Sequence, residues 1–277
     1  MARRYPLGFA LLLALAGSLL VQAVVLGAAA IRGLLLDRGF EGALYEVGLD
    51  PVTLGLAQAL GFGVAIAFGL SRTSAAADEV LGLEPIRWRI LLLAFGAGLS
   101  AQLPLTEIGN IARERWPLEL SEQLRHAQLV GPAGWIAAFG GVFAFVLIAP
   151  IFEELLFRGL LLRFLIEGYG RGTGILLSSL LFGLIHVDPA VIITASMAGW
   201  LFAELRLRSG SIWPAIGLHA GINALPLLLP PRLLRIPGFN TVQPEVYHLP
   251  AALVIGSGLV MALALWRLLA AKETERR

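Results

Sequence analysis

The stretch Ala149–Gly159, APIFEELLFRG, places Glu153, Glu154 and Arg158 in an otherwise apolar run. The chain before Glu153 has no Asp, Glu, Lys or Arg back to Arg125. An ionisable group deep in a membrane helix costs at least about 2.5 to 3.5 kcal/mol on insertion scales, and is by default a sign of function. The alternative is an anchor at the membrane surface, with Arg158 extending its head group towards water.

The composition indicates a protein that lives in a membrane. Of 277 residues, 57% are hydrophobic and 14% are charged, with a mean hydropathy of +0.80, whereas soluble domains carry roughly 25% charged residues. The net charge of +2 is too small to indicate a nucleic-acid partner. The absence of cysteine excludes disulfides, thiolate nucleophiles and cysteine-based metal sites.

Apolar segments of spanning or near-spanning length recur along the whole chain. We therefore predict an all-α fold, a polytopic membrane helical bundle of about eight transmembrane helices, with residues 1–277 forming a single integral membrane domain. The first apolar run exceeds the roughly 7 to 15 residues of a signal peptide, so we expect an uncleaved helix. The predicted segments are Leu7–Ile31, Val52–Leu70, Ile90–Leu105, Ala133–Phe157, Ile175–Val187, Ala190–Leu205, Ile212–Leu229 and Leu249–Leu269.

The basic residues predict the orientation of this bundle. Fourteen of the 21 Lys and Arg residues fall in segments on the side of the N-terminus, and seven fall on the opposite side. Because short cytoplasmic segments carry the excess of positive charge, we expect both termini in the cytoplasm. The short chain and its preference for Arg over Lys suggest a bacterial inner (plasma) membrane.

Helix geometry separates the two adjacent glutamates. Glu154 and Arg158 are four residues apart with the acid first, which favours an ion pair. Glu153 points about 100° away from Glu154, and its neighbour one turn on is Phe157. A carboxylate without a local cation is suited to act as a general acid or base.

Three further polar residues are expected to meet Glu153. His186 ends one apolar segment, and His219 and Asn223 share a face of the next but one. At about 1.5 Å of rise per residue, the distances back to the connecting turns put all of them at one depth, in the cytoplasmic half of the bilayer. A lone histidine in a membrane helix more often makes a hydrogen bond between packed helices than acts as a catalyst. The hypothesis of a catalytic site therefore depends on these polar residues meeting Glu153 together.

This set of residues has the chemistry for hydrolysing an amide. The reaction needs a base for water, an acid for the leaving nitrogen and donors for the oxyanion. Glu153 with His186 can activate the water, while His219 and Asn223 can donate to the oxyanion. Glu154 and Arg158 are expected to hold the helix and tune the site.

The motifs resemble those of the CAAX-prenyl-protease and bacteriocin-processing family (CPBP, or Abi) of intramembrane proteases. EELLFR from Glu153 is similar to EExxxR, FGLIH to FxxxH and HAGIN to HxxxN/D. The resemblance covers about residues 130–230, which we take as the catalytic core. It implies a membrane protease of about eight helices that acts on a protein or peptide substrate in or near the bilayer, through the first motif glutamate and the following histidine.

The resemblance leaves the cofactor open. Members of the family are often described as metal-dependent, and Glu153, His186 and His219 would make a two-histidine, one-carboxylate zinc set. We favour a metal-free site, because Asn223 lies beside His219 like an oxyanion partner and each histidine lacks a clear supporting carboxylate. Asp188 is a weak candidate for that support.

Other membrane proteases and other functions are less consistent with the sequence. The chain has no HExxH, GxSG or GxGD motif of the zinc, serine or aspartyl intramembrane types. A transporter using Glu153 and His186 as a proton relay remains an alternative, although no inverted repeat is visible. A non-catalytic scaffold is a third reading. The sequence does not choose among prenylated proteins, peptide precursors and C-terminal sorting signals as substrates.

Overall fold

The computed structural model describes residues 6–37, 39–131 and 134–275, and this part of the chain is helical and contains no β-strand. Each of the eight predicted segments overlaps a helix or a continuous run of helices, and Ala133, the start of the fourth segment, lies outside the described residues. Six of these are long and apolar enough to cross a membrane. The other two, α10 (Arg171–Leu184) and α12 (Trp213–Leu228), have 14 and 16 residues. The polytopic all-α fold is confirmed, and the number of eight crossings stays a prediction.

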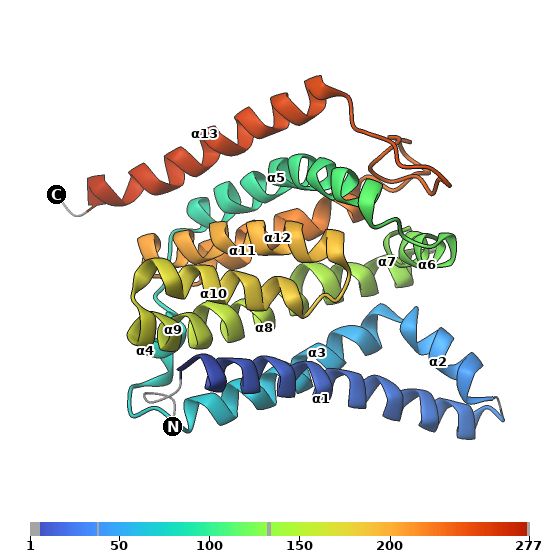
Figure 1. The fold of residues 1–277 in the computed structure, drawn as a ribbon, viewed down its shortest axis with the longest axis horizontal. Coiled ribbons are helices and arrows are strands. Elements are labelled where there is room, and N and C mark those ends of the chain that lie inside the picture. The colour runs from blue at the N-terminus through green and yellow to red at the C-terminus, as the bar shows by residue number, and fades with distance from the viewer. Residues whose placement is uncertain (1–5, 38, 132–133, 276–277) are drawn as a thin grey trace.

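The long elements run roughly along the long axis of the molecule, and two short helices, α2 and α6, cap one end, whereas α4 lies at the other (Figure 1). α2 and α6 lie at the end away from both termini, and the 229–250 connection lies there too. The long elements are α1 (Pro6–Leu35), α3 (Pro51–Leu70), α5 (Trp88–Arg115), the composite 135–169 helix, α10, α11 (Pro189–Ser209), α12 and α13 (Ala251–Glu275). The short helices are α2 (Phe40–Gly48), α4 (Ala77–Leu81) and α6 (Leu120–Val130).

The helices form three layers that place α12 and the composite 135–169 helix in the interior. On one side, α1 packs against α3. In the middle, α10 packs against α11, and α12 packs against α5. On the other side, α13 covers α5 (Figure 1). Small residues permit the tightest of these contacts. A Cβ added to Gly98 of α5 would collide with the Leu218 carbonyl of α12, which fixes the helix that carries His219 close to α5.

The 135–169 helix changes its winding twice around the two glutamates. It consists of α7 (Trp135–Gly141), a π-helical segment η1 (Val142–Ile148), α8 (Ala149–Glu154), a second π-helical segment η2 (Leu155–Leu161) and α9 (Leu162–Tyr169). Pro150 in α8 lacks an N–H donor and its ring crowds the carbonyl four residues earlier, so the wider winding of η1 accommodates it. The motif glutamates therefore lie on one short α-helical turn between two π-helical segments, which are frequent at functional sites.

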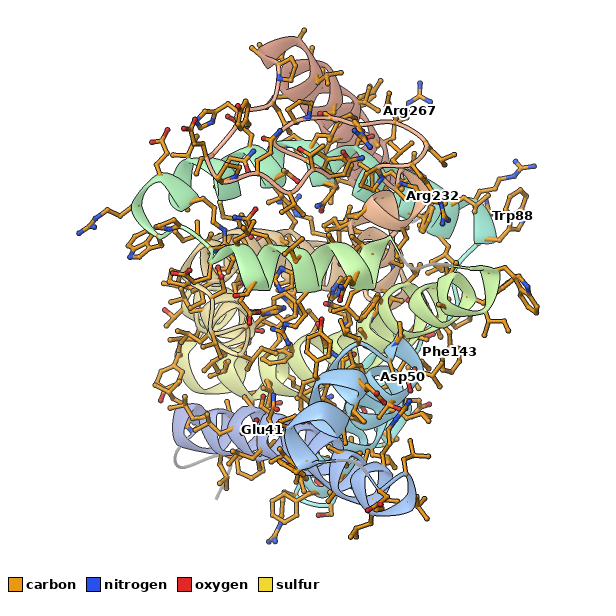
Figure 2. All side chains as sticks on the ribbon, turned by 90° about the vertical axis from the view of Figure 1, so that its right-hand side faces the viewer. Glu41, Asp50, Trp88, Phe143, Arg232 and Arg267 are labelled. Carbon is orange, nitrogen blue, oxygen red and sulfur yellow. The ribbon has the colours of Figure 1, made fainter. Side chains whose placement is uncertain are left out.

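Much of the outer surface is apolar, as expected for a protein that faces lipid. Trp88 is 65% exposed and Phe143 is 39% exposed, and both side chains point outward from the bundle (Figure 2). Polar and charged side chains with little exposure concentrate instead on the inner faces of the composite 135–169 helix, α10 and α12. The fold thus reverses the pattern of a soluble protein and directs attention to its buried polar centre.

Candidate active site

A fully buried ion pair lies at the centre of the bundle. Arg158 Nη1 donates to Glu154 Oε1 at 3.1 Å, and both side chains are 0% exposed. This is the i, i+4 pair expected from the sequence, and it persists although Arg158 lies in a π-helical segment. Glu154 therefore does not act as an isolated buried charge, because its cation is fixed one turn away.

Aromatic rings complete the surroundings of the Arg158 guanidinium. Its central carbon lies 4.2 Å from the ring centre of Phe182 and 5.1 Å from that of Phe202. A Cβ on Gly199 would approach Arg158 Nη2 to 2.6 Å, so only glycine leaves enough room there. Ring faces attract a cation that has lost its water. This compensates in part for the Nε and Nη2 atoms, which have no hydrogen-bond partner among the described residues.

His219 lies between the two glutamates. Its Nδ1 is 2.9 Å from Glu154 Oε1, whereas its Nε2 is 3.8 Å from Glu153 Oε2. Because a carboxylate only accepts, Nδ1 carries a proton, and in the neutral ring Nε2 then holds a lone pair. Two acceptors face each other across 3.8 Å, which is too long for a direct hydrogen bond, and a water beside them can donate one proton to each. The ring is stacked on Phe202 at 4.9 Å, which holds its orientation.

Glu153 is buried, with 5% of its surface exposed, and has a partner that the sequence did not indicate. Its Oε1 accepts a hydrogen bond of 3.1 Å from Gln58 Nε2 of α3. The prediction that Glu153 and His186 activate a water together stays a prediction. Within the described residues no carboxylate oxygen lies within 4.0 Å of a His186 ring nitrogen, whereas Glu153 Oε2 lies 3.8 Å from His219 Nε2. The geometry joins Glu153 to His219 instead, because α12 packs closer to α8 than the end of α10 does.

His186 lies in the turn just beyond the end of α10, not inside the helix. Its Nδ1 is 2.9 Å from the Phe182 carbonyl, one turn back. A carbonyl only accepts, so this contact places the proton on Nδ1 and leaves the Nε2 lone pair available. Val187 follows with φ at 65°, a left-handed conformation that β-branched residues rarely adopt. The backbone beside His186 is therefore strained, as is common at functional sites.

Asp188 fixes this corner from two directions. Its Oδ1 accepts from the N–H groups of Ala190 and Val191 and caps α11, while its Oδ2 accepts from Arg113 of α5 at 2.7 Å. Burial alone would raise the pKa of Asp188, but the hydrogen bonds from Arg113 and α11 outweigh it and lower the pKa from its ordinary value. Asp188 is therefore a corner residue that anchors the His186 turn, and within the described residues it makes no contact with a ring nitrogen of His186.

Asn223 lies one turn beyond His219 on α12. Its Nδ2 donates to the Phe145 carbonyl of η1 at 2.9 Å. An amide nitrogen has two N–H groups, so one of them remains for another acceptor. The shared face predicted for His219 and Asn223 places both on the wall of one cavity.

This cavity has a volume of about 470 Å³ and brings three of the six predicted residues together. Glu153, Glu154 and Arg158 are not among the residues of its wall, and Glu153 Oε2 lies 3.8 Å from Nε2 of His219, which is part of the wall. The wall includes residues of the last turns of α5, of α6 and of the 229–250 connection, which lie at the end away from both termini (Figure 1). The placement of the site in the cytoplasmic half of the bilayer stays a prediction. Polar and aromatic residues of the wall include Gln102, Arg113, His126, His186, His219 and Asn223.

The residues proposed as zinc ligands do not come together. In the described ranges, no group of three or more His, Asp or Glu side chains is positioned to hold a metal ion. Glu153 and His219 are adjacent, but His186 lies apart from both carboxylates. As placed, Glu153, His186 and His219 do not fit a zinc site.

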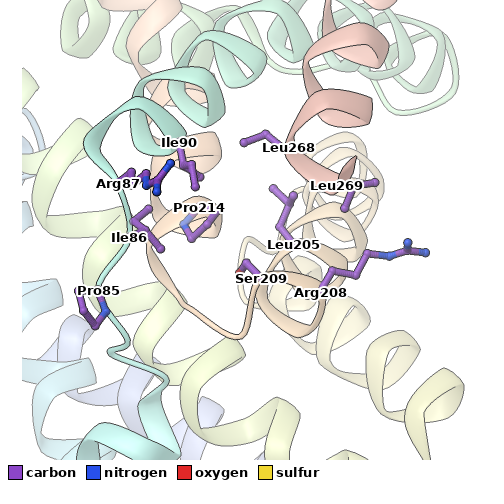
Figure 3. A pocket seen from close by; sticks show the side chains of 10 residues that line it. All are labelled: Pro85, Ile86, Arg87, Ile90, Leu205, Arg208, Ser209, Pro214, Leu268 and Leu269. Carbon is purple, nitrogen blue, oxygen red and sulfur yellow. The ribbon is translucent and has the colours of Figure 1, made fainter. Parts of the chain in front are cut away.

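A second cavity, of about 330 Å³, is lined by the start of α5 and the ends of α11 and α13 (Figure 3), which lie at the end of the bundle where the termini are (Figure 1). Arg87, Ile90 and Leu205 contribute to its wall, together with Arg208 and Leu268. It contains none of the predicted site residues and no histidine or carboxylate. The chemistry suggested by the sequence therefore belongs to the first cavity.

Residues 135–225 match the description of the type II CAAX prenyl endopeptidases, Rce1-like. This segment, about a third of the chain, is similar to the Rce1-like endopeptidases. It carries all six predicted site residues and lies within the 130–230 range taken as the catalytic core. Gln58 and Arg113, which contact Glu153 and Asp188, lie outside it, so the Rce1-like segment depends on contacts from the preceding helices.

A curated relative supports the same assignment. The candidate membrane peptidase YdiL of Bacillus subtilis (strain 168) is 30% identical over 83 residues, which is 30% of this chain and 34% of YdiL. The chain thus aligns with about a third of the length of this relative. No solved structure matches the chain. Together with the six apolar helices, these findings identify an integral membrane protein with a CPBP-type segment.

Proposed function

We propose that this protein is an intramembrane endopeptidase that hydrolyses a peptide bond of a membrane-associated protein or peptide. The observation that carries the proposal is the position of His219, bound to Glu154 on one side and 3.8 Å from Glu153 on the other, on the wall of a cavity of about 470 Å³. A structural ion pair needs only Glu154 and Arg158. Glu153 and the Nε2 atom of His219 are left for chemistry.

In the proposed reaction, Glu153 is the base. A water between Glu153 Oε2 and His219 Nε2 gives one proton to Glu153, and its oxygen attacks the carbonyl carbon of the substrate. The C–N bond then breaks and the leaving nitrogen takes the proton back from Glu153. His219 thereby shares the water with Glu153. The sequence favoured His186 for this role and His219 for a place at the oxyanion.

The cavity wall supplies the remaining groups. The second N–H of Asn223 can donate to the oxyanion, and such a donor is aligned before the reaction because Phe145 holds the amide. His186, with a lone pair on Nε2, can take up a proton, and as the imidazolium it can then donate to the oxyanion or to the leaving nitrogen. Glu154 and Arg158 do not touch the substrate in this scheme, and they fix His219 and the helix.

The proposal includes a setting for the enzyme. Its partners are the lipid bilayer and the substrate protein or peptide, in a bacterial inner membrane with both termini in the cytoplasm. The proposed mechanism uses no metal, and the described residues as placed do not form a zinc ligand set. The cavity would then open on the side away from the cytoplasm.

The test of the function is a comparison of cells that carry wild type, Glu153→Gln or Asn223→Ala. Proteins of the membrane fraction are compared by mass spectrometry for new N-termini. Glu153→Gln should abolish the cleavage while the protein inserts and folds normally, because only the base is lost. If no peptide bond distinguishes wild type from Glu153→Gln, the protein is not this protease, and a transporter or scaffold takes its place.

Asn223→Ala measures the oxyanion contribution. Loss of one such donor typically lowers the rate by about 10² to 10³. We expect that decrease with little change in substrate binding, measured on a synthetic peptide copied from the mapped cleavage site. A proton relay has no need of this amide, so an unchanged rate would contradict the proposed role.

Metal independence has its own test. Purified protein dialysed against a strong chelator should retain its activity. Loss of activity that zinc restores would show that Glu153, His186 and His219 rearrange into a metal site, and would overturn the metal-free mechanism.

A further inference from the structure

Gln58 is an unexpected polar residue in an apolar helix. In α3 it is the only residue besides Thr53 with a polar side chain, and Thr53 is used at the start of the helix, where it bonds Asp50. An amide buried among apolar groups costs free energy unless it is hydrogen-bonded. Gln58 therefore needs a partner in the interior, and the structure supplies Glu153.

The packing of α3 brings Gln58 to Glu153. A Cβ on Gly55 would lie 3.0 Å from the Ala144 Cα, and a Cβ on Gly63 would lie 3.4 Å from the Phe152 ring. These two glycines, on either side of Gln58 along α3, allow α3 to approach the 135–169 helix closely. The contact with Glu153 is thus a consequence of the helix interface and not of a flexible side chain reaching across a gap.

The hydrogen bond has a defined direction. Gln58 Nε2 donates to Glu153 Oε1 at 3.1 Å, as it must because an ionised carboxylate only accepts. This leaves Glu153 Oε2 on the side of His219 Nε2. The amide oxygen of Gln58 is buried and has no hydrogen-bond partner within the described part of the chain, so it can accept a bond from a water at the carboxylate.

We infer that Gln58 is a positioning residue for the proposed protease. It holds one oxygen of Glu153 so that the other faces His219 and the attacking water. The inference rests on the proposed function and extends it beyond residues 135–225, because Gln58 comes from α3. Without Gln58 the carboxylate of Glu153 can rotate away from His219. The fraction of molecules in which Glu153 faces both His219 and the attacking water then falls.

The test uses Gln58→Met, which keeps the length of the side chain and removes the amide. On the synthetic cleavage-site peptide, kcat should fall by about 10- to 100-fold, the effect of losing a hydrogen bond to a charged group. KM should not change, and the thermal midpoint should not fall. The matched control is Gln22→Met on α1, at an exposed position of another long helix, which should keep the wild-type kcat.

A second comparison shows whether Gln58 acts through Glu153. In the Glu153→Gln background, adding Gln58→Met should leave the residual rate unchanged. Gln58→Asn, which keeps an amide but shortens its reach, provides a second variant if the Met protein does not fold, and it should show the same fall in kcat.

The outcomes separate the two proposals. If Glu153→Gln is inactive and Gln58→Met cleaves at the wild-type rate, the positioning role is wrong and the protease stands. The positioning role is also wrong if Gln58→Met raises KM, lowers the thermal midpoint or slows the Glu153→Gln protein further. If Glu153→Gln still cleaves, the proposed function itself fails.

Discussion

Two histidines of this protein lie between pairs of glutamates, in opposite environments. His219 contacts Glu154 and faces Glu153 in the centre of the bundle, where the three side chains are at most 7% exposed. His248 contacts Glu107 at 2.7 Å and Glu114 at 2.9 Å, and its side chain is 42% exposed. The groups are the same, and the difference lies in burial and in the number of bonds made.

The exposed histidine uses both of its nitrogens, and the buried one uses a single nitrogen. His248 can bond two carboxylates at once only as an imidazolium, and the hydrogen bonds that it donates to Glu107 and Glu114 raise its pKa above the ordinary value. In the buried cluster Arg158 already neutralises Glu154, and the second contact of His219 is too long for a hydrogen bond. The His248 cluster, in which both nitrogens are hydrogen-bonded, holds its loop against α5. The His219 cluster leaves one nitrogen without a hydrogen bond, so that nitrogen is free to react.

Replacing each histidine by glutamine tests most directly whether only the buried one is needed for cleavage. His219→Gln should lower the cleavage rate by about 10² to 10⁴, the usual contribution of a positioned acid–base group. His248→Gln should leave the rate near wild type, because His248 is not on the cavity wall. Both rates are measured on the same synthetic peptide. Equal losses in the two variants would remove the distinction between the clusters.

Replacing one glutamate in each cluster compares their contributions to stability. Glu154→Gln leaves Arg158 buried without its counter-charge, so the free energy of unfolding should fall by about 3 to 5 kcal/mol. Glu107→Gln weakens a contact with an exposed histidine and should cost no more than about 1 kcal/mol. Thermal midpoints in detergent provide the comparison. A Glu154→Gln protein that is as stable as wild type would show that the aromatic rings alone hold Arg158.

The smallest expected effect is the pH dependence of the stability that the exposed His248 cluster provides. Because the folded pKa of His248 is raised above 6.5, its contribution to stability is complete below about that pH and is lost as the pH rises through the folded value. The thermal midpoint of wild type should therefore fall slightly over this window. A His248→Gln protein should lack this part of the dependence, and an identical pH profile would contradict the assignment.

Much of the fold follows from the sequence, because runs of apolar residues in a membrane leave few choices other than helices. Composition and hydropathy predicted the location of all eight helical regions. They did not predict the two π-helical segments around α8, since winding depends on how Pro150 and the packed neighbours are accommodated. Nor did they predict that α10 ends before His186, because Ile185 and Val187 continue the apolar pattern past the helix end.

Only the contacts within a single helix of the candidate site could be predicted from the sequence. The bond between Glu154 and Arg158 and the common face of His219 and Asn223 follow from helix periodicity. The contact of His219 with Glu154 and that of Gln58 with Glu153 join residues 65 and 95 positions apart. Such contacts depend on which helices pack together. The one available signal for Gln58 was its isolation as a polar residue in an apolar helix.

The length of α10, which ends just before His186, has a consequence for the surrounding lipid. α10 has 14 residues, which is about 21 Å at 1.5 Å per residue, and its Leu176, Leu180 and Leu184 are exposed, whereas the hydrocarbon layer is about 30 Å thick. Hydrophobic mismatch of this kind draws the head groups inward and thins the bilayer. We expect the thinned patch to lie over the corner at Asp188, where it would shorten the path of water to His186.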